Sequence, residues 1–200
     1  GLGDVYKRQH HDLGCLGSAI NPRALERQLQ MMKDMGANAV RTSHNPPAPE
    51  LLDICDRIGL LVQDEAFDMW RKRKSPYDYA RYFDEWHERD LTDLILRDRN
   101  HPSIFMWSIG NEVDYPNDPY SHPILDGSTI NQPMFGGYKS DAPDAMRIGK
   151  IAKRLAACVR AVDTSRPVTG ALAGVVMSNQ TEYPEAIDVV GLSLIHISEP

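Results

Sequence analysis

A carboxylate and an amide stand side by side at the end of an apolar run of this sequence. Residues 103–109 (SIFMWSI) are mostly apolar, and Gly110, Asn111 and Glu112 follow them. A carboxyl group at the end of a buried strand meets little water, and desolvation raises its pKa. Such a group can act as a general acid at neutral pH. Asn111 can hydrogen-bond a substrate hydroxyl, but neighbours on a strand point to opposite faces, so the backbone must bend there.

Other polar residues follow predicted strands in the same way. Arg41 and His44 lie at the end of a strand predicted over residues 38–43, and Asp64 and Glu65 end a strand that begins at residue 60. Polar side chains at the carboxyl ends of parallel strands are typical of the active face of a (β/α)8 barrel. The sequence therefore predicts one site that is built from several strand ends.

Strand and helix patterns alternate along the chain and would position these residues. Helices are predicted from Asn21-Pro22 to Gly36, from about residue 50 to Gly59, over 83–100 and over 148–162, and further strands over 103–109, 168–172 and 187–190. This alternation predicts a parallel sheet. A doubly wound sheet also fits it, but no glycine-rich phosphate-binding motif follows any strand. Residues 114–143, rich in Pro, Asp, Gly and Asn, are predicted to form a long loop.

The number of strands predicts an incomplete barrel. A full barrel has eight strands and typically ~250 residues, whereas this chain has 200 residues and patterns for five or six strands. The predicted fold class is therefore α/β, a (β/α)8 TIM barrel truncated after about the sixth strand. Such a chain exposes sheet edges, and we expect it to be partly folded or to aggregate in isolation.

Composition and charge exclude several classes of protein. With 42% hydrophobic and 25% charged residues, the chain is neither disordered nor collagen-like. A net charge of −6 without a basic stripe argues against nucleic acid as the main partner. No run of about 18 apolar residues could span a membrane. Three cysteines, Cys15, Cys55 and Cys158, lie far apart and form neither a zinc pattern nor a disulfide framework.

Both ends of the chain differ from the patterns beside them. Residues 1–9 (GLGDVYKRQ) and 193–200 (SLIHISEP) resemble read-through of a cloning or sequencing adaptor. We therefore expect residues 10–192 to be the native barrel segment and exclude the two ends from fold reasoning. The native N-terminus would then be missing, and the location, cytoplasmic or periplasmic, stays open.

Four motifs carry a resemblance to a known family. They are HHDLG at 10–14, NAVRTSHNP at 38–46, LLDICDRIGLLVQDEAFD at 51–68 and RDRNHPSIFMWSIGNE at 97–112. Together they resemble the barrel of the family 2 glycoside hydrolases, in particular the β-galactosidases, over nearly all of residues 10–191. The resemblance implies a retaining exo-glycosidase that hydrolyses terminal β-galactosides, with a carbohydrate partner and no cofactor.

The resemblance also implies roles for residues at the strand ends. Glu112 would be the general acid/base, and Asn111 would hold the 2-hydroxyl of the sugar. Arg41 would help to position the nucleophile, and His44 would contact the sugar. The family's nucleophile is a Glu on the seventh strand, beyond the end of this chain. We therefore expect the 200-residue chain to be inactive by itself, although its parent would be an enzyme.

Further residues are implied with less direct roles. His10, at the end of the first strand, would line the site, and Asp64 and Glu65 would support the floor of the pocket. Some of these galactosidases bind Mg²⁺ through a Glu and a His shortly after the Asp-Glu pair, where Met69 and Arg71 stand here. A thioether and a cation cannot replace the oxygen or imidazole ligands of Mg²⁺, so no metal is predicted at this position.

Three other interpretations remain open. His10, His11, Asp12 and His44 suggest a metal-dependent hydrolase, although adjacent histidines on a strand point to opposite faces. A chain that ends naturally before the seventh strand would be a non-catalytic sugar-binding or scaffold protein. β-Glucuronidases and β-mannosidases share the fold and the Asn-Glu pair, so the sugar rests on resemblance alone. Trp70 would either stack on a sugar or cover the barrel rim.

Overall fold

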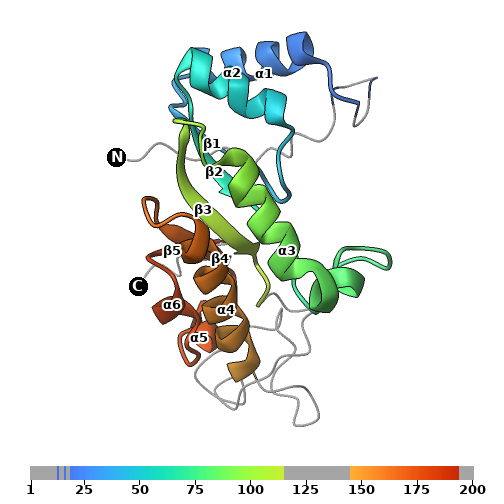
Figure 1. Cartoon of the computed structure of the whole chain (residues 1–200), viewed down its shortest axis with the longest axis vertical. Coiled ribbons are helices and arrows are strands. Elements are labelled where there is room, and N and C mark those ends of the chain that lie inside the picture. Colours follow the sequence, from blue (N-terminus) through green and yellow to red (C-terminus); the bar gives the residue numbers. More distant parts are fainter. Residues whose placement is uncertain (1–12, 14–15, 17–18, 115–144, 194–200) are drawn as a thin grey trace, which may run out of the picture.

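A computed structural model describes residues 13, 16, 19–114 and 145–193 of the chain. Its centre is one sheet of five parallel strands whose spatial order follows the chain (Figure 1). The strands are β1 (Ala39–Arg41), β2 (Leu61–Glu65), β3 (Ile104–Asn111), β4 (Val168–Leu172) and β5 (Val189–Leu192). Parallel neighbours joined by helices are the repeating unit of a (β/α)8 barrel, and the described strands form part of the wall of such a barrel. The predicted fold class is confirmed.

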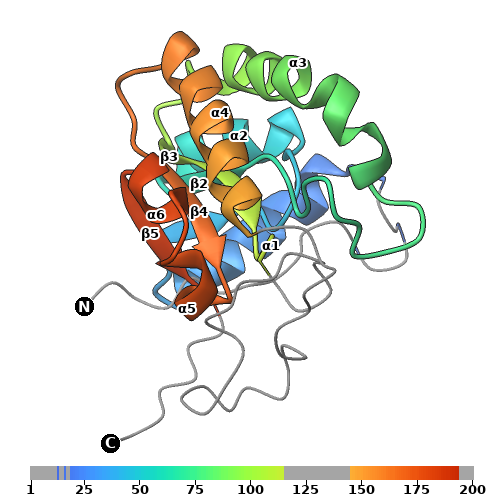
Figure 2. The same cartoon turned by 90° about the horizontal axis from the view of Figure 1, so that it is seen from below.

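Helices connect the strands. They are α1 (Pro22–Asp34), α2 (Pro49–Ile58), α3 (Ala80–Asp98), α4 (Met146–Val162) and the short α5 (Val175–Ser178) and α6 (Tyr183–Ala186). The helix α1 packs along α2, and α3 lies beside α4 (Figures 1 and 2). None of the helices in the described ranges is both long and apolar enough to cross a membrane.

Local sequence explains where the helices begin and end. Asn21 caps α1, because its side-chain oxygen accepts a hydrogen bond from the backbone N–H of Ala24 at 3.1 Å. Gly36 and Gly59 follow α1 and α2 with φ angles of +93° and +74°. This left-handed conformation is one that glycine adopts without a steric cost. The predicted helix boundaries at these positions are confirmed.

Alternation along the strands divides the polar residues between two sides of the sheet. Glu65 pairs in register with Ser108, and the preceding residue Asp64 pairs with Trp107. The Trp107 indole donates to Asp163, at the end of α4, at 3.0 Å, which places that side against the helices. The opposite side carries Glu65 and Ser108, which face the interior of the barrel.

The element boundaries differ from the sequence predictions in a few places. The strand β3 extends to Asn111, two residues beyond the predicted end, and β5 begins at Val189 rather than at residue 187. The helices α5 and α6 have only four residues each, too few to give a helical repeat in the sequence. Most of the predicted loop at 114–143 and both predicted foreign ends, apart from Ser193, lie outside the described residues.

Candidate active site

The end of β3 bends at Glu112. This residue has a φ angle of +46°, and it is a non-glycine residue with positive φ, a conformation that costs of order 1–3 kcal/mol. The N–H of Asn111 donates to the carbonyl of Phe67, and the N–H of Glu112 donates to the carbonyl of Ala171 on the other side. Because Glu112 leaves the regular strand geometry, its side chain no longer has to point away from that of Asn111. The bend that the sequence argument required is present.

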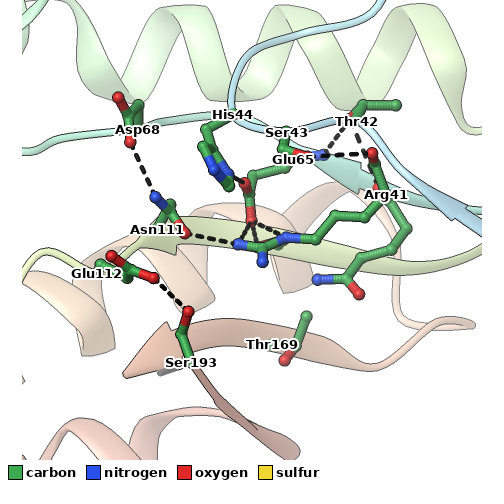
Figure 3. Close-up of polar contacts among 12 residues, drawn as sticks. Arg41, Thr42, Ser43, His44, Glu65, Asp68, Asn111, Glu112, Thr169 and Ser193 are labelled. Atoms are coloured by element: carbon green, nitrogen blue, oxygen red, sulfur yellow. Dashed lines mark hydrogen bonds and ion pairs between the residues drawn. The ribbon is translucent and has the colours of Figure 1, made fainter. Parts of the chain in front are cut away.

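A buried ion pair lies beside this strand end (Figure 3). The Arg41 guanidinium, on β1, donates to Oε2 of Glu65 from Nε at 2.9 Å and from Nη2 at 2.6 Å. The same Nη2 atom donates to Oδ1 of Asn111 at 2.9 Å. The Arg41 side chain is only 7% exposed and that of Glu65 is inaccessible, so neither charge is screened by water. Arg41 thus connects Glu65 to Asn111, across three neighbouring strands.

Glu65 accepts hydrogen bonds on both of its carboxylate oxygens. In addition to Arg41, Nδ1 of His44 lies 2.5 Å from Oε1, and the Ser108 hydroxyl donates to Oε2 at 2.5 Å. The backbone N–H of Glu65 donates to the Thr42 hydroxyl at 2.9 Å. These contacts satisfy the charge of Glu65 and hold the side chains of Arg41, His44 and Ser108 around it. Glu65 is therefore the counter-charge beneath the site.

The side-chain amide of Asn111 is oriented from both ends. Its oxygen accepts from Arg41, and its nitrogen donates to Oδ1 of Asp68 at 2.9 Å. A cation on one side and a carboxylate on the other permit only this assignment of oxygen and nitrogen. The second N–H of the amide is then directed by its neighbours and can donate to a ligand. Sequence reasoning missed Asp68, because a carboxylate three residues beyond a strand carries no periodic signal.

Lys74 also belongs to this cluster. Its ammonium group donates to Oδ1 of Asp68 at 2.8 Å and to the backbone carbonyl of Asn111 at 2.6 Å. The residue lies in the charged segment 71–74, where four basic residues in a row indicate a solvated loop. The Lys74 side chain is nevertheless only 24% exposed. One basic residue of this loop is therefore directed into the protein.

Asp64 requires a correction, because the structure does not bring it to the cluster. It is 1% exposed and lies on the helix side of β2, one residue before Glu65 and therefore on the opposite face. Burial, together with the nearby carboxyl group of Asp98 at the end of α3, raises the pKa of Asp64 well above its ordinary value. The side chain packs between sheet and helix and does not line the candidate site.

The remaining residues that were predicted to line the site lie in different places. His44 lies at the cluster, whereas His10 is outside the described residues. Trp70 is 1% exposed and donates from its indole N–H to the carbonyl of Ile109 at 2.8 Å, so that it packs in the core and does not offer its face to a sugar. The hydroxyl of Ser193 donates to Oε1 of Glu112. Ser193 is the first residue of the segment that we predict to be foreign.

The positions that were compared with a magnesium site do not fit that ion. Met69 is 8% exposed and presents a thioether. Nε of Arg71 lies 2.6 Å from an Asp84 carboxylate oxygen on α3. Across the described part of the chain, no three His, Cys, Asp or Glu side chains are grouped so that they could hold a metal ion.

Comparison with known proteins gives the family. The sequence model described as "Glycosyl hydrolases family 2, TIM barrel domain" matches residues 5–186. The β-galactosidase BoGH2A of Bacteroides ovatus is 51% identical over 186 residues, which cover 91% of this chain and 22% of that protein. A putative β-glucuronidase of Formosa agariphila is 54% identical over 106 residues, which cover 52% of this chain and 10% of that protein.

Solved structures agree with these relatives. A glycosyl hydrolase family 2 member from Bacteroides cellulosilyticus matches with a TM-score of 0.73 and 40% identity, covering 92% of this chain and 20% of that one. A β-glucuronidase of Bacteroides uniformis matches with a TM-score of 0.68 and 28% identity, covering 96% and 21%. The chain thus spans about a fifth of the length of these relatives. It belongs to family 2 of the glycosyl hydrolases, and its described residues are part of the TIM barrel domain of that family.

Proposed function

We propose that this chain is the acid/base portion of a retaining exo-glycosidase that hydrolyses terminal β-galactosides. The observation that carries the proposal is the end of β3, where Glu112 leaves the strand next to an Asn111 amide that Arg41 and Asp68 orient. The 51% identity to a β-galactosidase supports the choice of sugar. The shared family with β-glucuronidases keeps a β-glucuronide as the second candidate.

In the proposed reaction, Glu112 acts twice. Its carboxyl group first gives a proton to the glycosidic oxygen while the bond from that oxygen to the anomeric carbon breaks. A second carboxylate attacks the anomeric carbon and forms a covalent glycosyl-enzyme. Glu112, now a carboxylate, takes a proton from water, and the resulting hydroxide equivalent displaces the enzyme carboxylate. The directed N–H of Asn111 would hold a sugar hydroxyl throughout.

The second carboxylate lies outside the described residues in this proposal. Glu65 cannot attack, because its side chain is inaccessible and both oxygens accept hydrogen bonds. Asp68 is paired with Lys74 and Asn111. Asp114 accepts from two backbone N–H groups at 2.9 Å each and from a serine hydroxyl. Each of these three carboxylates is committed to holding the structure. None of these three carboxylates is therefore available as the nucleophile, and we expect, from the resemblance to the family, a Glu of the seventh strand in that role.

The test begins with the gene. The source DNA is read past both ends of this chain, and the longer polypeptide, called here the parent protein, is expressed and assayed on aryl β-galactoside, β-glucuronide and β-mannoside. We expect hydrolysis of the galactoside, with loss of activity in Glu112→Gln. The matched control Glu185→Gln, an exposed glutamate of α6, should leave it unchanged.

Each other outcome contradicts a part of the proposal. Activity on the glucuronide or mannoside alone would overturn the choice of sugar, and unchanged activity in Glu112→Gln would overturn the role of that residue. Hydrolysis by the 200-residue chain itself would show that its nucleophile is present. A stop codon directly after Pro200 would overturn the proposal in favour of a non-catalytic sugar-binding fragment.

A further inference from the structure

Lys74 contacts the peptide bond that precedes Glu112. The peptide unit between Asn111 and Glu112 has two polar edges, its carbonyl and its N–H. The carbonyl accepts from the Lys74 ammonium at 2.6 Å, and the N–H donates to the carbonyl of Ala171 on β4 at 2.8 Å. With both edges held, the plane of this peptide is fixed relative to the sheet.

Lys74 supplies the hydrogen-bond donor that the backbone of β2 would supply if that strand were longer. In a regular parallel ladder, the carbonyl of Asn111 would accept a backbone N–H from the neighbouring strand. The strand β2 ends at Glu65, and the last backbone donors and acceptors on that side are the N–H of Ala66 and the carbonyl of Phe67. Beyond them, a side chain from the loop supplies the donor. An ammonium group gives a shorter and stronger hydrogen bond than a backbone amide.

The loop is built so that Lys74 reaches this carbonyl. The carboxylate of Asp78 accepts from the backbone N–H groups of Lys74 and Ser75 at 2.6 and 2.7 Å. Its other oxygen accepts from the N–H of Ala80, the first residue of α3, at 3.1 Å. The backbone at residue 74 is thereby attached to the start of α3. Asp68 then holds the ammonium group from the other end of the side chain.

We propose that Lys74 is a positioning residue that directs Glu112 for proton transfer. Glu112 has a φ angle of +46°, a conformation that an unrestrained glutamate seldom adopts. Because φ rotates the side chain relative to the preceding peptide plane, fixing that plane and φ together fixes the direction of the Cα–Cβ bond from which the carboxyl group extends. Without Lys74, the peptide can rotate toward a relaxed strand geometry and carry the carboxyl group away from the glycosidic oxygen.

This inference rests on the proposed function, and the leaving group of the substrate tests it separately. A poor leaving group needs the proton of Glu112 to depart, whereas a strongly acidic phenol departs without it. In the parent protein, we expect Lys74→Met to lower kcat/KM about 10- to 100-fold for an alkyl or 4-methoxyphenyl glycoside. For the 2,4-dinitrophenyl glycoside of the same sugar, the decrease should stay below about threefold. Glu112→Ala should give the same pattern more strongly.

Controls distinguish positioning from general damage. Lys72→Met makes the same change two positions earlier in the loop and should leave both substrates unaffected. If Lys74→Met does not fold, Lys74→Arg keeps the charge but misplaces the donor, and the same comparison of substrates applies. Equal losses on both substrates, or no loss on either, would overturn the inference. An unaltered parent protein that hydrolyses no glycoside would instead overturn the proposed function.

Discussion

The buried pair of Arg41 and Glu65 allows a quantitative prediction for Glu65→Gln. The substitution keeps the shape of the side chain but removes the charge that faces two Arg41 donors, at 2.9 and 2.6 Å. Since the Arg41 side chain is only 7% exposed, its charge would stay buried without a counter-charge. Removing one partner of such a pair costs about 3–5 kcal/mol of the free energy of unfolding.

Hydrogen exchange in the parent protein can measure this cost locally. We expect the opening free energy of backbone amides in peptides covering β1 and β2 to fall by about 3–5 kcal/mol in Glu65→Gln. Arg41 also orients Asn111, so kcat/KM on the best glycoside should fall at least about tenfold. Adding Arg41→Met should return part of the lost stability, because no unpaired charge then remains.

An exposed pair in the same chain provides the control. Arg57 and Glu26 lie 2.7 Å apart, with side chains 57% and 42% exposed. Glu26→Gln breaks a pair of the same chemical kind, but solvent screens it, and the expected cost is below about 1 kcal/mol. Equal losses of protection in Glu65→Gln and Glu26→Gln would show that burial does not determine the cost of losing the counter-charge. A double variant with Arg41→Met that is less stable than Glu65→Gln alone would show that the unpaired Arg41 charge is not the cause of the loss.

Four further predictions follow from the structure. Burial and the Asp98 carboxyl group raise the pKa of Asp64, so the stability that Asp64 contributes is present at low pH and is lost as pH rises through the folded-state pKa. In calorimetry of the parent protein, Asp64→Asn should therefore gain stability relative to wild type as pH increases. A stability difference that does not change with pH would contradict this. Burial raises the pKa of Asp163, but hydrogen bonds from Ser165, Arg166 and Trp107 outweigh it and hold the pKa below its ordinary value. The stability it contributes is present above about pH 4 and is lost as pH falls through the folded-state pKa, so Asp163→Ala should cost roughly 1.5–3 kcal/mol at pH 7 in the same calorimetric measurement and less in acid. Treatment of the parent protein with a chelator should leave activity within about twofold, and a loss that Mg²⁺ restores would show a metal that we do not predict. The 200-residue chain alone should aggregate or melt without a cooperative transition, because β5 exposes three apolar side chains at 41%, 41% and 52%; a sharp monomeric melt would contradict this.

The sequence was sufficient to predict the five strands and the four long helices, and to predict that polar residues at the strand ends lie close together. Periodic apolar residues, an asparagine cap and two glycines marked the helices, and the apolar run before Gly110 marked the buried strand β3. Strand ends collect at one edge of a parallel sheet for topological reasons, so that Arg41, Glu65 and Asn111 could be brought together without coordinates. The contacts of these residues follow from that placement and from the need to pair a buried charge.

The sequence was not sufficient where a side chain's direction depends on loop geometry. Lys74 sits in a run of basic residues that resembles a solvated loop, and only the attachment of the loop through Asp78 directs it inward. Asp64 and Glu65 are adjacent acidic residues, and pattern alone did not distinguish which faces the barrel interior. The register of β2 against β3 decides it, because it pairs Asp64 with Trp107 on the helix side.

The polar cluster is a continuous chain of hydrogen bonds with one ion pair on each side of Asn111, and this limits which substitutions its residues tolerate. Glu65 pairs with Arg41, Arg41 donates to Asn111, Asn111 donates to Asp68, and Asp68 accepts from Lys74, which returns to the Asn111 carbonyl. The positive charges of the two cations balance the negative charges of the two carboxylates, so that removing one of the four leaves its partner without a counter-charge. Glu65 acts on the side-chain amide of Asn111 through Arg41, and Lys74 acts on the backbone carbonyl of the same residue. The effects of substitutions at Glu65 and Lys74 on the free energy of activation should therefore be less than additive, as expected for residues that orient one amide and the peptide bond that follows it.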